Sequence, residues 1–559
     1  MKGGTRKPIS AGRGMEPTGR AGDGNRRLAT LLVLVFFAVQ LTRLVQVRSA
    51  TGETPFLSAN DRSRWCTIAA LGIEGTYQID RLLEIRDPET RRRNWYTIDL
   101  VRHLGRDGRL HYYSSKPTLL PTLYAGVYIA VRNLTGWTLM GEPFLIVPLM
   151  LAIVNLLPLS LFYWGTIRWM QERFLRESTW GTVAVGMFLC WGCFLSTFTT
   201  TLNNHLPAAM ATGVALWCLD RMVLGDVRAR WFALCGLASA LAAANELPAL
   251  AWLAAAGGLC AWFDFRKAVV WWLPATLPVV LGAVGTNYMA HGTWKPAYAH
   301  RGAGEYLGTI ALDRPPATLD QAVADPVWRE RLIAALRQAG YLDRPEASVR
   351  VGRRPGTLEV LDEASGTHLA IVWDEPSGRA AVHRWGDWYD YPGSYWTAEN
   401  KRGIDRGEPS RIRYALHFLV GHHGIFSLTP FWLLAVWGTV RVLRTPLRPR
   451  VWLDRQFLVG LAIVAVSITV LVFYIVLRGQ EDRNYGGIAS GPRWTFWMIP
   501  LWLYLSGFAL QRLEAGGRWP QRGVEVLIAW SSLSACWAWN NPWSHPWLYQ
   551  WWLWMGWGG

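Results

Sequence analysis

Seven short polar motifs interrupt the apolar parts of this chain, and they carry the residue types of a binding or catalytic site. Lys116 is the most conspicuous, because about fifteen mostly apolar residues follow it in the stretch 112–131. An ionisable side chain at membrane depth costs several kcal/mol and usually marks a site or pathway. A lysine placed there would be balanced by a bound anion. The polar members of the motifs are Asn60, Asp61, Asp99, Arg102, His103, Ser114, Ser115, Lys116, Asn203, Asn204, His205, Asn245, Glu246, His422, His423, Asp482, Arg483, Asn484 and Arg493.

The composition places these motifs in a membrane protein. The chain has 559 residues, of which 51% are hydrophobic, and apolar runs of membrane-spanning length recur along it. Many of its 35 Trp lie near the ends of those runs, where an amphipathic ring suits the lipid–water boundary. The net charge of +17 does not indicate nucleic-acid binding, because the basic residues are scattered over many short loops.

Eleven apolar runs predict the spanning helices of an all-α polytopic protein. A Gly- and Arg-rich segment, 1–27, precedes the first run and is expected to be a disordered cytoplasmic tail. A cleaved signal peptide is the competing interpretation of that first run. The aromatic segment 542–559 is expected to lie at the membrane interface. The predicted spans are 28–47, 144–165, 179–198, 206–223, 231–246, 248–263, 268–288, 424–443, 457–477, 494–511 and 524–540.

Loop charge predicts which way these spans face, because Lys and Arg mark cytoplasmic loops. If the basic N-terminus lies inside and 119–133 spans, every short basic loop falls outside; if 119–133 does not span, all fall inside. We therefore expect 119–133 to lie along the outer surface, with the N-terminus cytoplasmic and the C-terminus outside. Segments 48–143 and 289–423 are then extracytoplasmic, and all the polar motifs face that side. The basic loops are 166–178, 221–230, 264–267, 441–455 and 512–522.

The second outer segment has a predicted α+β substructure of its own. Residues 325–340 show helical spacing with an aspartate near the start. Three runs rich in β-branched residues, 357–362, 368–374 and 379–385, are separated by turn sequences and predict a three-stranded meander. No catalytic signature is evident in this insertion. We expect a small domain that covers a site or recognises an acceptor.

The order of these features resembles the GT-C superfamily of membrane glycosyltransferases, in the layout of aminoarabinose transferases and protein mannosyltransferases. A first span leads into an outer loop that carries Asn60-Asp61-Arg62-Ser63-Arg64-Trp65, and Lys116-Pro117 precedes the surface helix. The resemblance covers about 28–290 in architecture and two short motifs in sequence.

Several positions depart from the family pattern. Asn60 precedes Asp61 where the family often has two acids, Ser115 stands in place of a glutamate, and Lys-Pro-Pro is Lys-Pro-Thr, ending at Thr118. The first outer loop has no Asp-x-Asp, which disfavours a metal-dependent oligosaccharyltransferase-like mechanism. We expect neither a metal nor a cofactor.

The resemblance implies inverting transfer of a sugar from a polyprenyl-phosphate donor to an acceptor on the extracytoplasmic face, in a bacterial inner membrane. Asp61 matches the acid that would serve as base. Cations should gather where the charge of the leaving phosphate develops. The expected phosphate ligands are Lys116, Arg483, Arg493, His422 and His423, and the expected sugar or acceptor ligands are Asn204, His205 and Glu246.

Simpler roles compete with these assignments. Asp61 can form a local ion pair with its arginine neighbours, Lys116 can reach lipid headgroups, and Asn204 can cap a helix. Asp99, on one predicted helical turn with Arg102 and His103, is expected to be scaffolding of the first outer loop.

Two other classes of protein remain as alternatives. A transporter or flippase of a lipid-linked anion could use the same cationic cavity, although no internal inverted repeat is evident. A non-catalytic membrane scaffold would leave the convergence of polar motifs unexplained. The sugar is not specified, and the acceptor could be a lipid, a glycan or a protein.

Overall fold

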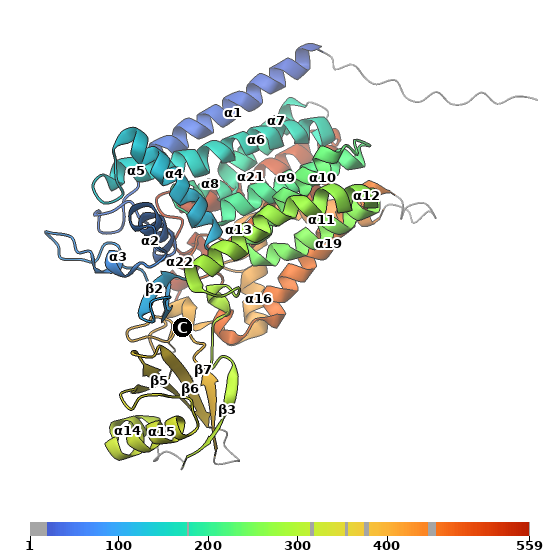
Figure 1. Ribbon diagram of the computed structural model, residues 1–559. Helices are drawn as coiled ribbons and strands as arrows, with labels where there is room; N and C mark the ends of the chain where they lie inside the picture. The colour runs from blue at the N-terminus through green and yellow to red at the C-terminus, as the bar shows by residue number, and fades with distance from the viewer. Residues whose placement is uncertain are drawn as a thin grey trace, which may run out of the picture.

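The computed structural model describes residues 19–175, 178–312, 318–352, 356–373, 379–397, 399–444 and 454–557. Long helices lie side by side in one body, and a small β domain with two short helices extends from one end of it (Figure 1). Helix α1 (Gly19–Gln46) begins earlier than expected, so residues 19–27 are helical rather than part of a disordered tail. Residues 1–18 of that predicted tail lie outside the described residues, as do 176–177, 445–453 and 558–559 of other predicted loops and tails.

Each predicted span is wholly or largely helical, although Thr429 interrupts 424–443 and the helix in 524–540 ends at Trp537. Within the described residues, five helices are long and apolar enough to cross a membrane, and a pair of helices bent by 42° makes a sixth if it is one span. These helices support a multi-pass membrane protein, while the number eleven stays a prediction. The five are Asp23–Gln46, Pro143–Leu175, His205–Val223, Phe265–His291 and Arg455–Leu477; the bent pair is Thr179–Gly192 with Phe194–Thr200; Leu247–Phe263 and Pro430–Leu443 are apolar but shorter.

The helical body contains many separate elements. Its α-helices beyond α1 are α5 (Pro143–Leu151), α6 (Leu157–Met170), α7 (Thr179–Met187), α8 (Phe194–Thr197), α9 (His205–Val223), α10 (Ala229–Asn245), α11 (Leu250–Phe263), α12 (Phe265–Lys267), α13 (Leu273–His291), α16 (Arg411–Leu419), α17 (Ile425–Leu428), α18 (Leu433–Leu443), α19 (Arg455–Val472), α20 (Ile499–Ala515), α21 (Arg518–Trp537) and α22 (Trp547–Trp554). Short π or 3-10 turns extend several of them, among them η2 (Gln171–Leu175), η11 (Phe473–Leu477) and η13 (Arg493–Met498).

Small residues let some of these helices approach closely. Gly438 of α18 packs so near the carbonyl of Leu505 in α20 that an added Cβ would collide with that backbone. Helices in membranes gain much of their association energy from this kind of close contact. In contrast, a Cβ added at Gly258 of α11 would meet nothing.

The first outer segment combines two helices, a hairpin and the expected surface helix. It contains α2 (Ala59–Glu74), α3 (Asp80–Glu84), the antiparallel strands β1 (Leu100–Leu104) and β2 (Leu110–Ser114), and α4 (Leu119–Thr135). The prediction that Asp99, Arg102 and His103 share a helical turn is wrong, because Arg102 and His103 lie in β1 and pair across to β2. The run Leu-Val-Arg-His-Leu at 100–104 shows no strict alternation of apolar and polar residues, so its pairing with β2 rather than a local pattern makes it a strand.

The predicted meander is confirmed and has one further strand at each edge. The sheet order is β3-β7-β6-β5-β4 and every pair is antiparallel. The predicted helix is also present: Asp325 caps it by accepting a hydrogen bond from the Val327 amide. The elements are β3 (Tyr306–Ala311), α14 (Leu319–Ala324), α15 (Pro326–Gln338), β4 (Ser348–Val351), β5 (Thr357–Asp362), β6 (Thr367–Trp373) and β7 (Arg379–Arg384); Asp374 lies outside the described residues.

Candidate active site

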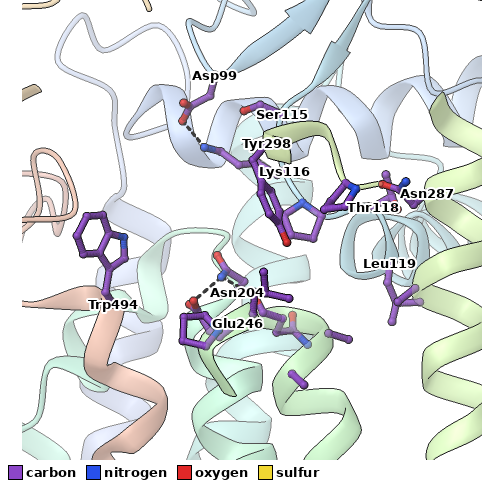
Figure 2. A pocket seen from close by; sticks show the side chains of 18 of the residues that line it. Asp99, Ser115, Lys116, Thr118, Leu119, Asn204, Glu246, Asn287, Tyr298 and Trp494 are labelled. Atoms are coloured by element: carbon purple, nitrogen blue, oxygen red, sulfur yellow. Dashed lines mark hydrogen bonds and ion pairs between the residues drawn. The ribbon is translucent and has the colours of Figure 1, made fainter. Parts of the chain in front are cut away.

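A cavity of about 510 Å³ lies where the starts and ends of several long helices meet the two outer segments (Figure 2). Its wall holds five Lys or Arg side chains but two carboxylates, so its charge favours an anionic ligand. These charged residues come from distant parts of the chain: Arg64, Asp99, Lys116, Glu246, Arg301, Arg478 and Arg493.

The rest of the wall is aromatic on some sides and aliphatic on others. Tyr474 and Trp494 stack with ring centroids 4.8 Å apart. Aromatic faces of this kind suit the C–H faces of a sugar, and the aliphatic stretch offers apolar surface for a hydrocarbon chain. The aromatic members are Trp294, Tyr298, Tyr389, Trp396, Phe473, Tyr474 and Trp494; the aliphatic ones include Leu119, Ala243, Ala244, Leu247, Ala283 and Val284.

Lys116 and Asp99 form an ion pair at the cavity, with Nζ 2.8 Å from Oδ2. The β1–β2 register brings them together, because Leu100 lies opposite Ser114 and the amide of Ser115 donates to the carbonyl of Asp99. Burial lowers the pKa of Lys116 to about 8; Asp99 opposes this shift, and the nearby Arg64 adds to it. Asp99, expected to be scaffolding, is therefore a member of the site.

A second chain of hydrogen bonds runs along the opposite wall, as the Asn204–Glu246 pair in Figure 2 shows. Arg64 donates to the side chain of Asn60 at 2.5 Å and to the side-chain oxygen of Asn204. Asn204 in turn donates to Glu246 Oε1 at 2.7 Å. Burial lowers the pKa of the Arg64 guanidinium to about 10. Arg64 therefore stays charged at neutral pH.

His205 joins that chain to Arg493, and its partners determine its tautomer. Arg493 Nη1 lies 3.3 Å from His205 Nε2, and a guanidinium can only donate. Nε2 must therefore accept, so the proton of the neutral ring sits on Nδ1 and is donated to Glu246 Oε1. Among the described residues no partner bonds Glu246 Oε2, which leaves that oxygen open toward the cavity.

Asn204 occupies the N-cap position of helix α9, but the side chain of Asn203 makes the capping hydrogen bond. The Asn203 side chain accepts from the Leu206 amide at 3.0 Å, whereas the Asn204 side chain is held by Arg64 and Glu246. The predicted grouping of Asn204, His205 and Glu246 thus occurs in the cavity wall.

Asp61 lies apart from this wall. It is 1% exposed and forms a capping box with Ser58 at the start of α2. Its Oδ1 accepts from the Ser58 amide at 2.8 Å, and its Oδ2 accepts from the Leu57 amide at 3.0 Å and the Thr201 hydroxyl at 2.9 Å. Burial raises the pKa of the Asp61 carboxyl against these bonds. Since both oxygens are occupied, this geometry offers no support for Asp61 as a base.

Of the other predicted phosphate ligands, one lines the cavity and three lie away from it. Arg493 lines the cavity, but Arg483 donates to the carbonyls of Glu408 and Pro409, both at 2.8 Å. His422 and His423 belong to an aromatic cluster in which His417 stacks on His422 at 3.9 Å. Neither histidine is among the described residues that line the cavity.

The sequence patterns assigned no site role to three sets of cavity residues, of which the first is Arg64 in the motif at 60–65. Arg301, Tyr389 and Trp396 reach the cavity from the second outer segment, and Trp396 Nε1 donates to the Ile98 carbonyl at 2.8 Å, which ties the two outer segments together. Arg478 reaches it from the end of η11. No local pattern distinguishes the residues of these last two sets from ordinary loop residues.

The described His, Cys, Asp and Glu side chains form no group of three or more that could hold a metal ion. No protein-family model matches the chain, and no curated protein resembles it in sequence.

One comparison with solved structures finds a remote likeness. It is the archaeal oligosaccharyltransferase AglB from Archaeoglobus fulgidus, solved in complex with an inhibitory peptide and a dolichol-phosphate. The two are 12% identical with a TM-score of 0.38; the match covers 92% of this chain and 56% of that one. This chain therefore spans little more than half of AglB. Such a match is a distant likeness of fold only, and no functional conclusion rests on it.

Proposed function

We propose that this protein is a membrane glycosyltransferase that takes a sugar from a polyprenyl-phosphate donor. The observation that carries the proposal is the cavity itself, which combines an excess of cations with two carboxylates, aromatic walls and an adjoining aliphatic surface. A lipid-linked sugar phosphate has the three matching parts: an anion, a sugar and a hydrocarbon chain.

The donor phosphate binds at Lys116, with Arg64 and Arg493 nearby. Asp99 neutralises Lys116 at 2.8 Å in the absence of ligand, and the incoming phosphate takes its place as the partner of the ammonium group. A buried cation stabilises the charge that develops on the leaving phosphate. The prenyl chain follows the aliphatic wall beside α4 and α13.

Glu246 is the general base in this proposal. Its Oε1 is held by Asn204 and His205, which orients the free Oε2 toward the cavity. The acceptor oxygen bonds to the anomeric carbon while its proton passes to Glu246 Oε2. The bond from that carbon to the phosphate oxygen breaks, and the polyprenyl phosphate leaves with the electron pair. Attack opposite the leaving group inverts the anomeric centre.

Native mass spectrometry of the detergent-purified protein tests the donor site. The wild type should carry a polyprenyl-phosphate species that Lys116→Ala loses, and its mass would reveal the sugar. Lys267→Ala is the matched control, because Lys267 forms a lysine–aspartate pair with Asp264 at the same 2.8 Å but lies outside the cavity lining. Retention of the same lipids by all three proteins would contradict the assignment.

Three carboxylate-to-amide variants test the base with the identified donor. Glu246→Gln should reduce transfer by about 10²–10⁴-fold while donor binding persists, since proton transfer contributes that much. Asp99→Asn should act mainly on donor binding, and Asp61→Asn should leave turnover per folded molecule near that of the wild type. If Asp61→Asn lost sugar transfer while Glu246→Gln kept full activity, Asp61 would be the base, as the sequence motif predicts. A donor that binds and crosses the membrane without transfer would favour a transporter.

A further inference from the structure

A second cavity, of about 500 Å³, lies toward the other end of α6 and α9. Helix α6 packs between α1 and α9 in this region (Figure 1). The interval from His205 at the candidate active site to Arg221 is 16 residues of α9, or about 24 Å of helix. The two cavities share no lining residue. By loop charge, this second groove lies on the cytoplasmic side.

The groove is apolar in its inner part and basic at its end. Phe162, Gly213 and Pro500 line the inner part; a Cβ added at Gly213 would collide with the Phe162 ring, so glycine is what lets that ring form the floor. Three arginines, each near the cytoplasmic end of its helix, line the outer part: Arg26 of α1, Arg168 of α6 and Arg221 of α9. This arrangement matches an amphiphile with its headgroup at the membrane surface.

The charge of the basic end is largely uncompensated. Arg168 pairs with Glu172 at 3.1 Å, and Glu172 also lines the groove. Neither Arg26 nor Arg221 makes an ion pair with any described residue; Arg221 lies 5.2 Å from the centroid of the Trp217 ring. Basic pockets between helices on the cytoplasmic side of membrane proteins bind acidic lipid headgroups.

The middle of the groove is also open. Gly165 of α6 lines it, and a Cβ added there would meet no atom within 4 Å. A larger side chain at this position would fill the groove without displacing its walls. The tryptophans Trp164, Trp169 and Trp217 flank the space, and such rings favour the headgroup level of a bilayer.

We propose that this groove binds one anionic glycerophospholipid of the cytoplasmic leaflet, with its phosphate at Arg168 and Arg221 and an acyl chain over Gly165 and Phe162. The site is independent of the proposed donor site, so the failure of either leaves the other standing.

The test is a titration of the full-length, detergent-purified protein with phosphatidylglycerol, followed by native mass spectrometry, with phosphatidylcholine and soluble glycerol phosphate as comparison ligands. Arg168→Gln and Arg221→Gln should each weaken phosphatidylglycerol binding about fivefold. Arg230→Gln is the matched control, because Arg230 also lies over a tryptophan ring, at 4.5 Å from Trp231, but does not line the groove.

Gly165→Leu tests the groove without changing charge. It should abolish retention of the lipid, whereas Gly258→Leu, at an equally open glycine outside the groove, should not. Equal binding of phosphatidylcholine, an equal loss in Arg230→Gln, or full retention in Gly165→Leu would overturn the proposal. Tight binding of glycerol phosphate would also overturn it, because the ligand would then be a soluble anion. Melting temperatures of all variants establish that they are folded.

Discussion

The affinity of the candidate active site for a donor phosphate should fall as pH rises through about 8. Burial lowers the pKa of Lys116 to about that value, so the free protein loses this cation in mildly alkaline solution. The pKa of Arg64 stays near 10, so its charge persists over the same interval. The loss between pH 7 and pH 9 therefore belongs to Lys116.

The size of the effect follows from the fraction of Lys116 that is protonated. With a pKa of about 8, the ammonium form makes up about nine-tenths of the protein at pH 7 and about one-tenth at pH 9. A ligand that binds only the ammonium form loses about tenfold in affinity, or about 1.4 kcal/mol. Because a bound anion raises the pKa of Lys116 again, binding at pH 8 should also take up a proton.

Isothermal titration with a short-chain prenyl-phosphoryl sugar measures both quantities. This phosphodiester carries one charge over the whole interval, so the ligand itself does not titrate. Lys116→Arg should bind with a flat profile up to pH 9, since a guanidinium stays charged; Lys116→Met should bind weakly and also without pH dependence. If Lys116→Met kept the tenfold fall, the reasoning from the buried lysine would be refuted.

Three further results are expected. Asp61→Ala should lower the melting temperature, because it leaves the Leu57 and Ser58 amides and the Thr201 hydroxyl without their acceptor, at a cost of about 1–3 kcal/mol each if they stay buried; an unchanged melting temperature would contradict the anchoring role. Gly438→Ala should destabilise the protein through the clash with Leu505, whereas Gly258→Ala should not. In intact cells, a membrane-impermeant thiol reagent should label Arg81→Cys and spare Arg230→Cys; the reverse pattern would invert the topology.

Much of the architecture could be predicted from local patterns. Apolar runs of sufficient length become helices because a backbone in lipid must satisfy its own hydrogen bonds. The strands of the insertion were predictable from local patterns as well: three β-branched runs separated by turn sequences form the neighbouring strands β5, β6 and β7. Adjacent residues were also informative where they lie on one short segment, as Asn204 and His205 do at the start of α9.

The tertiary structure alone decided where each polar side chain points and which residue it bonds to. The motif around Asp61 has the composition of a catalytic loop, yet the capping box turns that carboxylate inward against Thr201. Asp99 contacts Lys116 because the register of the β1–β2 hairpin places the two residues side by side. The sequence separation of the two residues does not predict that register. The sequence by itself determined that the long apolar runs are helices and that the β-branched runs of the insertion are strands, whereas the side on which each segment lies stays a prediction from loop charge. Only the packing of distant segments decided which charged groups share the cavity, because that depends on long-range contacts that no local pattern contains.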